Sequence, residues 1–240
     1  MRLRLLVLAS LAAITMAAPG AGRPKPARID PGTLYAQHLA RLRSVFREAY
    51  APDVEFSAIV YSSGYPEQLI ALRRSGDSYE VFAREPARAI WTYGMVQQFR
   101  SRLIAKVRVK TGGRMEDLSD AEADRLASTV PADPRDLKLS GCAAPIEPRM
   151  AAQLVATWQH LFTRVPESAA SGVPGLMGTY LIRTGKDERE LFLSQWMPAG
   201  PAKRVIRLVD ALYRVCRDGR PDGRVTDEEF LEALATPPAP

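Results

Sequence analysis

Apolar residues recur at three- and four-residue spacing along several segments of the chain, which is the pattern of an amphipathic helix. The first segment runs from Pro31 to about Tyr50, and Asp30 before Pro31 is a helix-start pattern. Ser119 and Glu122 form a capping-box pattern at the start of a later segment. The same spacing predicts further helices over residues 87–103, 119–130, 148–164, 203–217 and 227–235.

Alternation of apolar and polar residues between turns rich in glycine and proline predicts β-strands. Three such runs follow one another within residues 54–84, separated by the turns SGYP and SGD. They predict a three-stranded antiparallel meander that ends at Pro86. Residues 104–110 predict a further strand with a polar face, and residues 179–184 and 190–196 predict a second hairpin.

Runs of strands separated by helices, without regular alternation of strand and helix, predict the α+β class. We expect an antiparallel sheet built from the three-stranded meander and the second hairpin, packed with about five helices. One domain should cover residues 32–236, with two lobes that divide near residues 131–141. A flexible linker at residues 21–31 should precede it, and a disordered tail at residues 237–240 should follow.

The first residues of the chain have the composition of an export signal. Arg2 and Arg4 precede an apolar run that is too short to span a bilayer, which needs about 20 apolar residues. Small residues follow, which predicts a signal peptide over residues 1–20 that is cleaved between Ala17 and Gly22. We therefore expect a periplasmic or secreted protein without a membrane span after cleavage.

The chain contains two cysteines, Cys142 and Cys216. Because export delivers a protein to a compartment where disulfides form, we expect these two residues to be bonded. Closing a loop of this length stabilises a fold by roughly 4 kcal/mol in the chain-entropy model. A cysteine nucleophile would instead need a base beside it, and His38 and His160 are the only histidines.

Composition excludes general disorder, because hydrophobic residues at 46% and charged residues at 25% are near the averages of globular proteins. The formal net charge is +6, and the basic residues are scattered along the chain rather than clustered. Scattered charge of this kind is typical of a solvated surface. We expect no nucleic-acid partner, because no basic run with interleaved aromatic residues occurs.

Sequence motifs that carry catalysis are absent: there is no Gly-x-Ser-x-Gly, Ser-x-x-Lys, His-Glu-x-x-His or phosphate-loop motif. His38 shares the apolar stripe of the first helix with Leu34 and Leu42, which predicts a buried histidine bonded to one partner. His160 follows Trp158 toward the polar side of its helix, which predicts a surface position. No spacing of histidine, cysteine and acidic residues indicates a zinc site.

A segment near the end resembles an EF-hand calcium loop. Asp218, Asp222 and Glu229 occupy loop positions one, five and twelve, and glycine occupies position six. Arg220, however, stands where the third oxygen ligand is needed. The same segment also fits a capping box in which Thr226 and Glu229 begin the last predicted helix.

Several aromatic residues are candidates for a binding groove, although aromatic residues at helix or strand spacing usually belong to a core. Tyr65, in a turn before Pro66, is the one expected to be exposed. The set comprises Tyr61, Tyr65, Trp91, Tyr93, Trp158 and Trp196.

The last hundred residues carry a layout that resembles uncharacterised exported bacterial proteins. It runs from Cys142 through a helix with Trp158 to the segment GLMGTYLI and a strand with Trp196. This resemblance implies export and no particular activity.

Export, a single disulfide and the missing catalytic motifs together favour non-catalytic binding of a protein or polymer of the envelope or extracellular space. An exported hydrolase is an alternative, because catalytic residues are often assembled from distant segments. A calcium-stabilised protein with a degenerate EF-hand-like loop is a second alternative. Apart from calcium, no cofactor is indicated.

Overall fold

The computed structural model describes residues 31–61, 66–101, 103–111, 114–165, 179–192 and 200–218. The following predicted segments lie outside the described residues: the signal peptide at 1–20, the linker at 21–31 except Pro31, the helix at 227–235 and the tail at 237–240. Pro31 is the first residue of α1.

The described residues form helices and strands in a mixed order along the chain. The helices are α1 (Pro31–Val45), η1 (Arg47–Tyr50), α2 (Ile90–Arg100), α3 (Asp120–Thr129), η2 (Pro134–Asp136), α4 (Pro148–Arg164) and α5 (Pro201–Asp218). The strands are β1 (Val54–Tyr61), β2 (Gln68–Ser75), β3 (Ser78–Pro86), β4 (Arg108–Thr111), β5 (Arg114–Asp117), β6 (Leu139–Ile146), β7 (Thr179–Thr184) and β8 (Asp187–Phe192).

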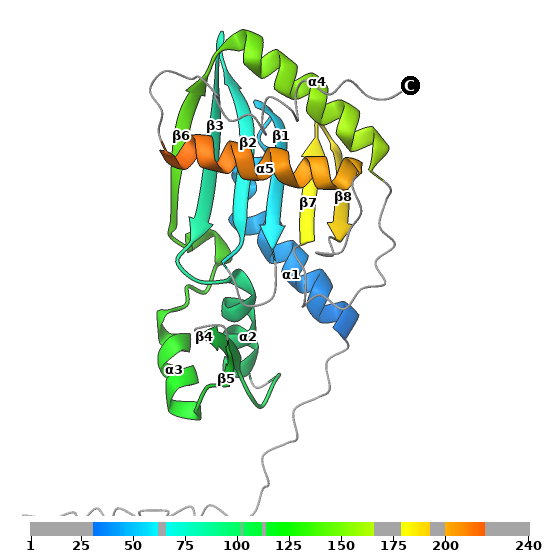
Figure 1. The fold of residues 1–240 in the computed structure, drawn as a ribbon. Helices are drawn as coiled ribbons and strands as arrows, with labels where there is room; N and C mark the ends of the chain where they lie inside the picture. Colours follow the sequence, from blue (N-terminus) through cyan, green and yellow to red (C-terminus); the bar gives the residue numbers. More distant parts are fainter. Residues whose placement is uncertain are drawn as a thin grey trace, which may run out of the picture.

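A six-stranded antiparallel sheet forms the centre of the molecule, with α4 and α5 on one face and α1 on the other (Figure 1). Its strand order is β6-β3-β2-β1-β7-β8. The order contains the predicted meander, β1-β2-β3, and the predicted second hairpin, β7-β8. The predicted α+β class is therefore confirmed.

The face under α4 and α5 carries the larger core, which we call the front core. Alternate residues of β1 such as Phe56 and Ala58 point into it, as predicted. The Phe56 ring stacks on Trp158 of α4 with 4.4 Å between ring centroids, and the Trp158 indole nitrogen donates to the Arg183 carbonyl at 3.0 Å. The buried indole of Trp158 therefore has an aromatic contact for its ring and a hydrogen-bond acceptor for its nitrogen.

The opposite face carries the back core, which packs under α1 and η1. Ile59 and Tyr61 of β1 point into it. Val54 also lies there, on the face opposite Phe56, because the register between β1 and β2 shifts between these two residues. The first predicted helix is corrected here: α1 ends at Val45 and a tighter 3₁₀ turn follows, through which the chain bends into β1.

Cys142 of the edge strand β6 and Cys216 of α5 lie at disulfide distance, with 5.6 Å between their Cα atoms. This confirms the predicted pairing, which joins α5 to the edge of the sheet. Such a pair is typical of proteins that fold in an oxidising compartment.

A smaller lobe, made of α2, β4, β5 and α3, lies between β3 and β6 in the sequence and beyond one end of the sheet in space (Figure 1). We call it the insertion lobe; its own core includes Val96, Phe99 and Ala127. The capping box at the start of α3 is confirmed, since Ser119 and Glu122 exchange side-chain-to-backbone hydrogen bonds.

Three predicted boundaries need correction. Helix α2 covers only Ile90–Arg100, and the strand predicted at 104–110 begins at Arg108. It pairs with β5, which was not predicted because its sequence, RMED, is mostly charged. Strand β8 begins at Asp187, earlier than predicted, since Gly185 adopts a φ of 57° and permits a tight turn.

No helix among the described residues is apolar over a length that would cross a membrane.

Candidate functional site

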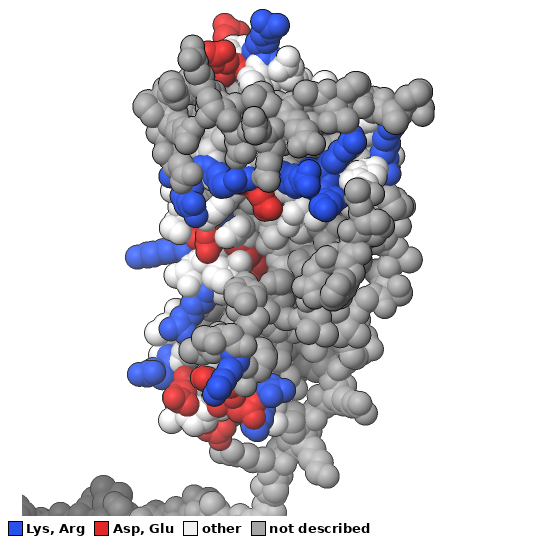
Figure 2. All heavy atoms as spheres, in the orientation of Figure 1, with Lys and Arg blue, Asp and Glu red and all other residues white. Residues whose placement is uncertain are grey.

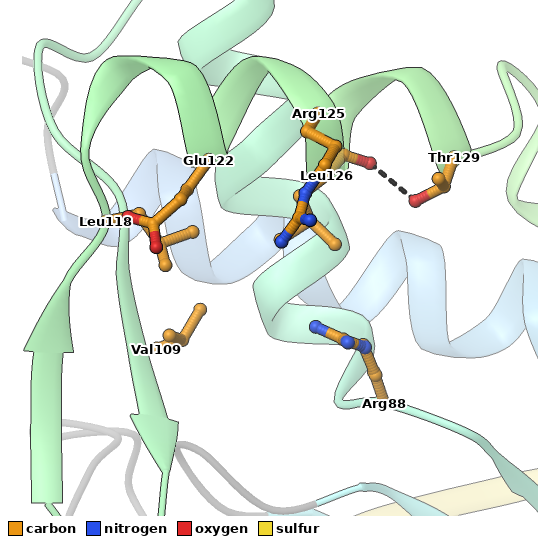
Figure 3. A pocket seen from close by; sticks show the side chains of 7 residues that line it. All are labelled: Arg88, Val109, Leu118, Glu122, Arg125, Leu126 and Thr129. Carbon is orange, nitrogen blue, oxygen red and sulfur yellow. Dashed lines mark hydrogen bonds between the residues drawn. The ribbon is translucent and has the colours of Figure 1, made fainter.

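A solvent-open pocket of about 240 Å³ lies in the insertion lobe (Figure 3). One face of helix α3 supplies one wall of the pocket. Strand β4 and the segment after β5 supply the apolar wall, and Arg88, two residues before α2, closes the pocket. The lining residues are Arg88, Val109, Leu118, Glu122, Arg125, Leu126 and Thr129.

Arg88 and Arg125 extend their guanidinium groups into this pocket from the α2 and α3 sides (Figure 3). Both residues are exposed, and no carboxylate of the described residues lies within ion-pair distance of either. Arginine offers several donors in a planar arrangement that fits carboxylate and phosphate groups. The pocket therefore presents two cations to solvent.

Glu122 is the one acidic residue that lines the pocket, and its carboxylate is already engaged. It accepts hydrogen bonds from the Ser119 hydroxyl at 2.6 Å and from the Ser119 backbone nitrogen at 3.0 Å. These bonds from Ser119, and to a smaller extent the positive charge of Arg125, hold the pKa of Glu122 below its usual value. The carboxylate therefore serves the capping box at the start of α3.

The rest of the lining is mostly apolar. Val109, Leu118 and Leu126 are half-buried and pack against the small core of the insertion lobe. Two guanidinium groups beside an apolar surface fit a ligand with an anionic group next to an apolar one. The arrangement offers binding, and it places no nucleophile beside a base.

The surface of α5 is the other basic region, and Figure 2 shows Lys and Arg side chains in a row across the molecule at the level of this helix. The exposed basic residues there include Lys203 and Arg207. Arg214 and Arg217 already interact with other groups of the protein, and Arg217 lies over the Tyr213 ring. The pocket is therefore the better candidate for ligand binding.

A second polar site is buried where the insertion lobe meets the sheet. Glu67, which precedes β2, is completely buried, and its carboxylate accepts hydrogen bonds from the backbone nitrogens of Ile90 and Trp91. The N-cap residue of α2, Ala89, has no side chain that could do this. Glu67 therefore caps α2 from a distant part of the chain.

His38 of α1 lies beside this carboxylate, with its Nε2 atom 3.7 Å from Glu67 Oε1. Its Nδ1 atom is buried and has no hydrogen-bond partner among the described residues. The ring makes edge contacts with Tyr61 and Trp91. His38 is buried, as predicted, with 3% of its surface exposed.

Burial changes the protonation of both groups. Desolvation lowers the pKa of His38 to about 4, with a smaller contribution from the positive charge of Arg41. Desolvation raises the pKa of Glu67 to about 7, against the opposing effect of the Ile90 and Trp91 amides. Near neutral pH the His38 ring is therefore uncharged, and the Glu67 carboxyl group is present in both its ionised and its neutral form.

The structure keeps the two histidines apart. His38 lies under α1 on the back face of the sheet, whereas His160 belongs to α4 on the front face. Within the described part of the chain, no three histidine, cysteine or acidic side chains gather as metal ligands. Asp218 is the last residue of α5, and Asp222 and Glu229 lie outside the described residues, so the calcium loop stays a prediction.

The aromatic candidates do not line one groove. Trp158 is buried in the front core, Tyr61 is buried in the back core, and Trp91 and Tyr93 are half-buried on α2. Tyr65 and Trp196 lie outside the described residues.

Sequence reasoning missed Arg88, Arg125 and Glu67. Arg125 could have been found, because Glu122, Arg125 and Thr129 share one face of a predicted helix. Arg88 and Glu67 acquire their roles only through tertiary contacts.

Comparison with known proteins gives no match to a family model, to a curated protein or to a solved structure.

Proposed function

We propose that this chain is an exported, non-catalytic binding protein that holds an envelope or extracellular partner by an anionic group seated between Arg88 and Arg125. The observation that carries the proposal is the pair of guanidinium groups facing one pocket, without an ion-pair partner among the described residues. The apolar lining adds that the anionic group should have an apolar neighbour.

The location of the protein is part of the same proposal. The predicted signal peptide over residues 1–20 and the pairing of Cys142 with Cys216 both support the periplasm or the extracellular space. In that setting, two sources offer an anionic group beside an apolar one. They are a fatty acyl carboxylate and the carboxyl terminus of a protein chain that ends in an apolar residue.

Calorimetric titration of the protein with octanoate tests the proposal directly. We expect saturable binding of octanoate and much weaker binding of acetate, which lacks the apolar part, and of octanol, which lacks the charge. N-acetyl-leucine distinguishes the two sources, because tighter binding than octanoate would favour a protein chain terminus and weaker binding a fatty acyl group.

Arg88→Gln and Arg125→Gln should each weaken octanoate binding by about fivefold, the effect of one solvent-exposed charged contact. Arg149→Gln is the matched control, since Arg149 is an exposed arginine on α4, away from the pocket. Absence of octanoate and N-acetyl-leucine binding, or equal loss in all three variants, would overturn the proposal.

A further inference from the structure

The start of α2 connects the buried Glu67 carboxylate to the ligand pocket. Ile90 and Trp91 donate their backbone N–H groups to Glu67, and Arg88 is two residues before Ile90. Ala89, between them, is buried. The backbone that positions the Arg88 guanidinium is therefore held by a carboxylate from the residue that precedes β2.

The strength of this attachment depends on the charge of Glu67. An ionised carboxylate accepts stronger hydrogen bonds than a neutral one, and it is favoured at the N-terminus of a helix by the helix dipole. A neutral carboxyl group loses both advantages. The carboxyl proton can instead point toward His38 Nε2, which lies 3.7 Å from Glu67 Oε1 and is an acceptor when the ring proton is on Nδ1.

Among the described residues, no Lys or Arg side chain lies within ion-pair distance of the Glu67 carboxylate. Helix α1 contributes His38, which stays neutral near pH 7, and Arg41, whose charge acts on His38. Strand β1 contributes Tyr61, which donates to Glu190 of β8. Helix α2 contributes its amides and Tyr93. Burial raises the pKa of Tyr93, the positive charge of Arg88 lowers it, and the charge of Glu67 raises it further.

We propose that Glu67 is a pH-sensitive cap of α2 that controls ligand binding in the insertion lobe by fixing, or releasing, the backbone that carries Arg88. This inference rests on the proposed function of the pocket. With Glu67 ionised, the start of α2 is held and Arg88 is in place. When the carboxylate takes up one proton from solvent and stays buried, its contact moves toward His38 and the start of α2 loosens. The direction follows because the Ile90 and Trp91 amides lower the pKa of Glu67, so they bind its ionised form more strongly than its neutral form.

The pH dependence of octanoate affinity tests this inference. The affinity should fall about fivefold from about pH 8 to about pH 6, the loss expected for one helix cap. Octanoate and arginine keep their charges throughout this range, so a change reports on another group of the protein. In Glu67→Gln, which is permanently neutral, the affinity should equal the low-pH value at both pH values.

Glu190→Gln is the matched control. Burial also raises the pKa of Glu190 to about 7, and this residue contacts Tyr61 of β1 rather than the start of α2. The variant should keep the pH dependence of the unmodified protein. A flat affinity in the unmodified protein, or the same pH dependence in Glu67→Gln, would overturn the inference while leaving the proposed function intact.

Hydrogen exchange at the Ile90 and Trp91 amides gives a second measurement that needs neither a ligand nor a variant. After correction for the intrinsic pH dependence of exchange, protection of these amides should increase from about pH 6 to about pH 8. Unchanged protection would overturn the inference even if Glu67→Gln fails to fold. Failure of octanoate to bind at any pH would count against the proposed function instead.

Discussion

The sheet with α4 and α5 and the insertion lobe are built from the same chain but differ in how much they bury. The front core brings together both helices and all six strands of the sheet, and the disulfide joins α5 to β6. The core of the lobe consists of six buried residues, mostly valine and alanine, between α2, α3 and the segment that leads into β4. A region with so little buried apolar surface opens more easily than the sheet.

In the proposed function, this difference in buried surface separates the support of the site from the binding of the ligand. Binding regions are commonly drawn from the less stable parts of a fold, because a ligand site must open and close. In the proposed function, the segment that leads into β2 supplies Glu67, and the insertion lobe supplies Arg88 and Arg125. At the junction between the regions, Gln98 of α2 donates to Gln37 of α1 at 2.9 Å, and Ile90 of α2 is buried in the back core.

Trp158→Ala should have the largest effect of the changes that test this comparison. Removing a fully buried indole that stacks on Phe56 should lower the free energy of unfolding of the sheet region by about 3–5 kcal/mol, measured by urea denaturation. Gln159→Ala, at the neighbouring exposed position of α4, should change it little. A loss below about 1 kcal/mol for Trp158→Ala would contradict the assignment of the front core as the main source of stability.

Replacing Cys142 and Cys216 together by alanine should have the next largest effect. We expect a loss of about 2–4 kcal/mol in the free energy of unfolding, the typical range for a disulfide, because the unfolded chain regains the freedom of a long loop. Amide exchange should increase in β6 and α5 first, while the affinity of the pocket for octanoate stays the same at temperatures where the variant is folded. A change in octanoate affinity as large as that of Arg88→Gln would show that the two regions are not separate in function.

The sheet was also the region that the sequence predicted better. Alternating apolar residues in β1, β2 and β3 and the apolar stripe of α4 are local patterns, and both were found within a few residues. The disulfide followed from there being only Cys142 and Cys216 to pair.

The functional candidates could not be predicted in the same way. Glu67 is 23 residues from the amide of Ile90, and a carboxylate that caps a helix from that distance leaves no local pattern. Arg88 and Arg125 meet only because the insertion lobe folds back on itself. Strand β5 was missed because its charged residues do not alternate with apolar ones, and it becomes a strand through its pairing with β4.

Ser119→Ala should have the smallest effect and should be confined to the insertion lobe. The Ser119 hydroxyl caps α3, the helix that presents Arg125 to the pocket, so its loss should cost about 1 kcal/mol of local stability. We expect faster amide exchange in α3, weaker octanoate binding and unchanged exchange in β1 and β2. Ser128→Ala is the matched control on the same helix, because its hydroxyl only donates back to the Arg125 carbonyl and alanine favours the helix interior. If Ser119→Ala instead accelerates exchange in the sheet as much as in α3, the lobe and the sheet unfold as one unit, and the division of tasks between them is wrong.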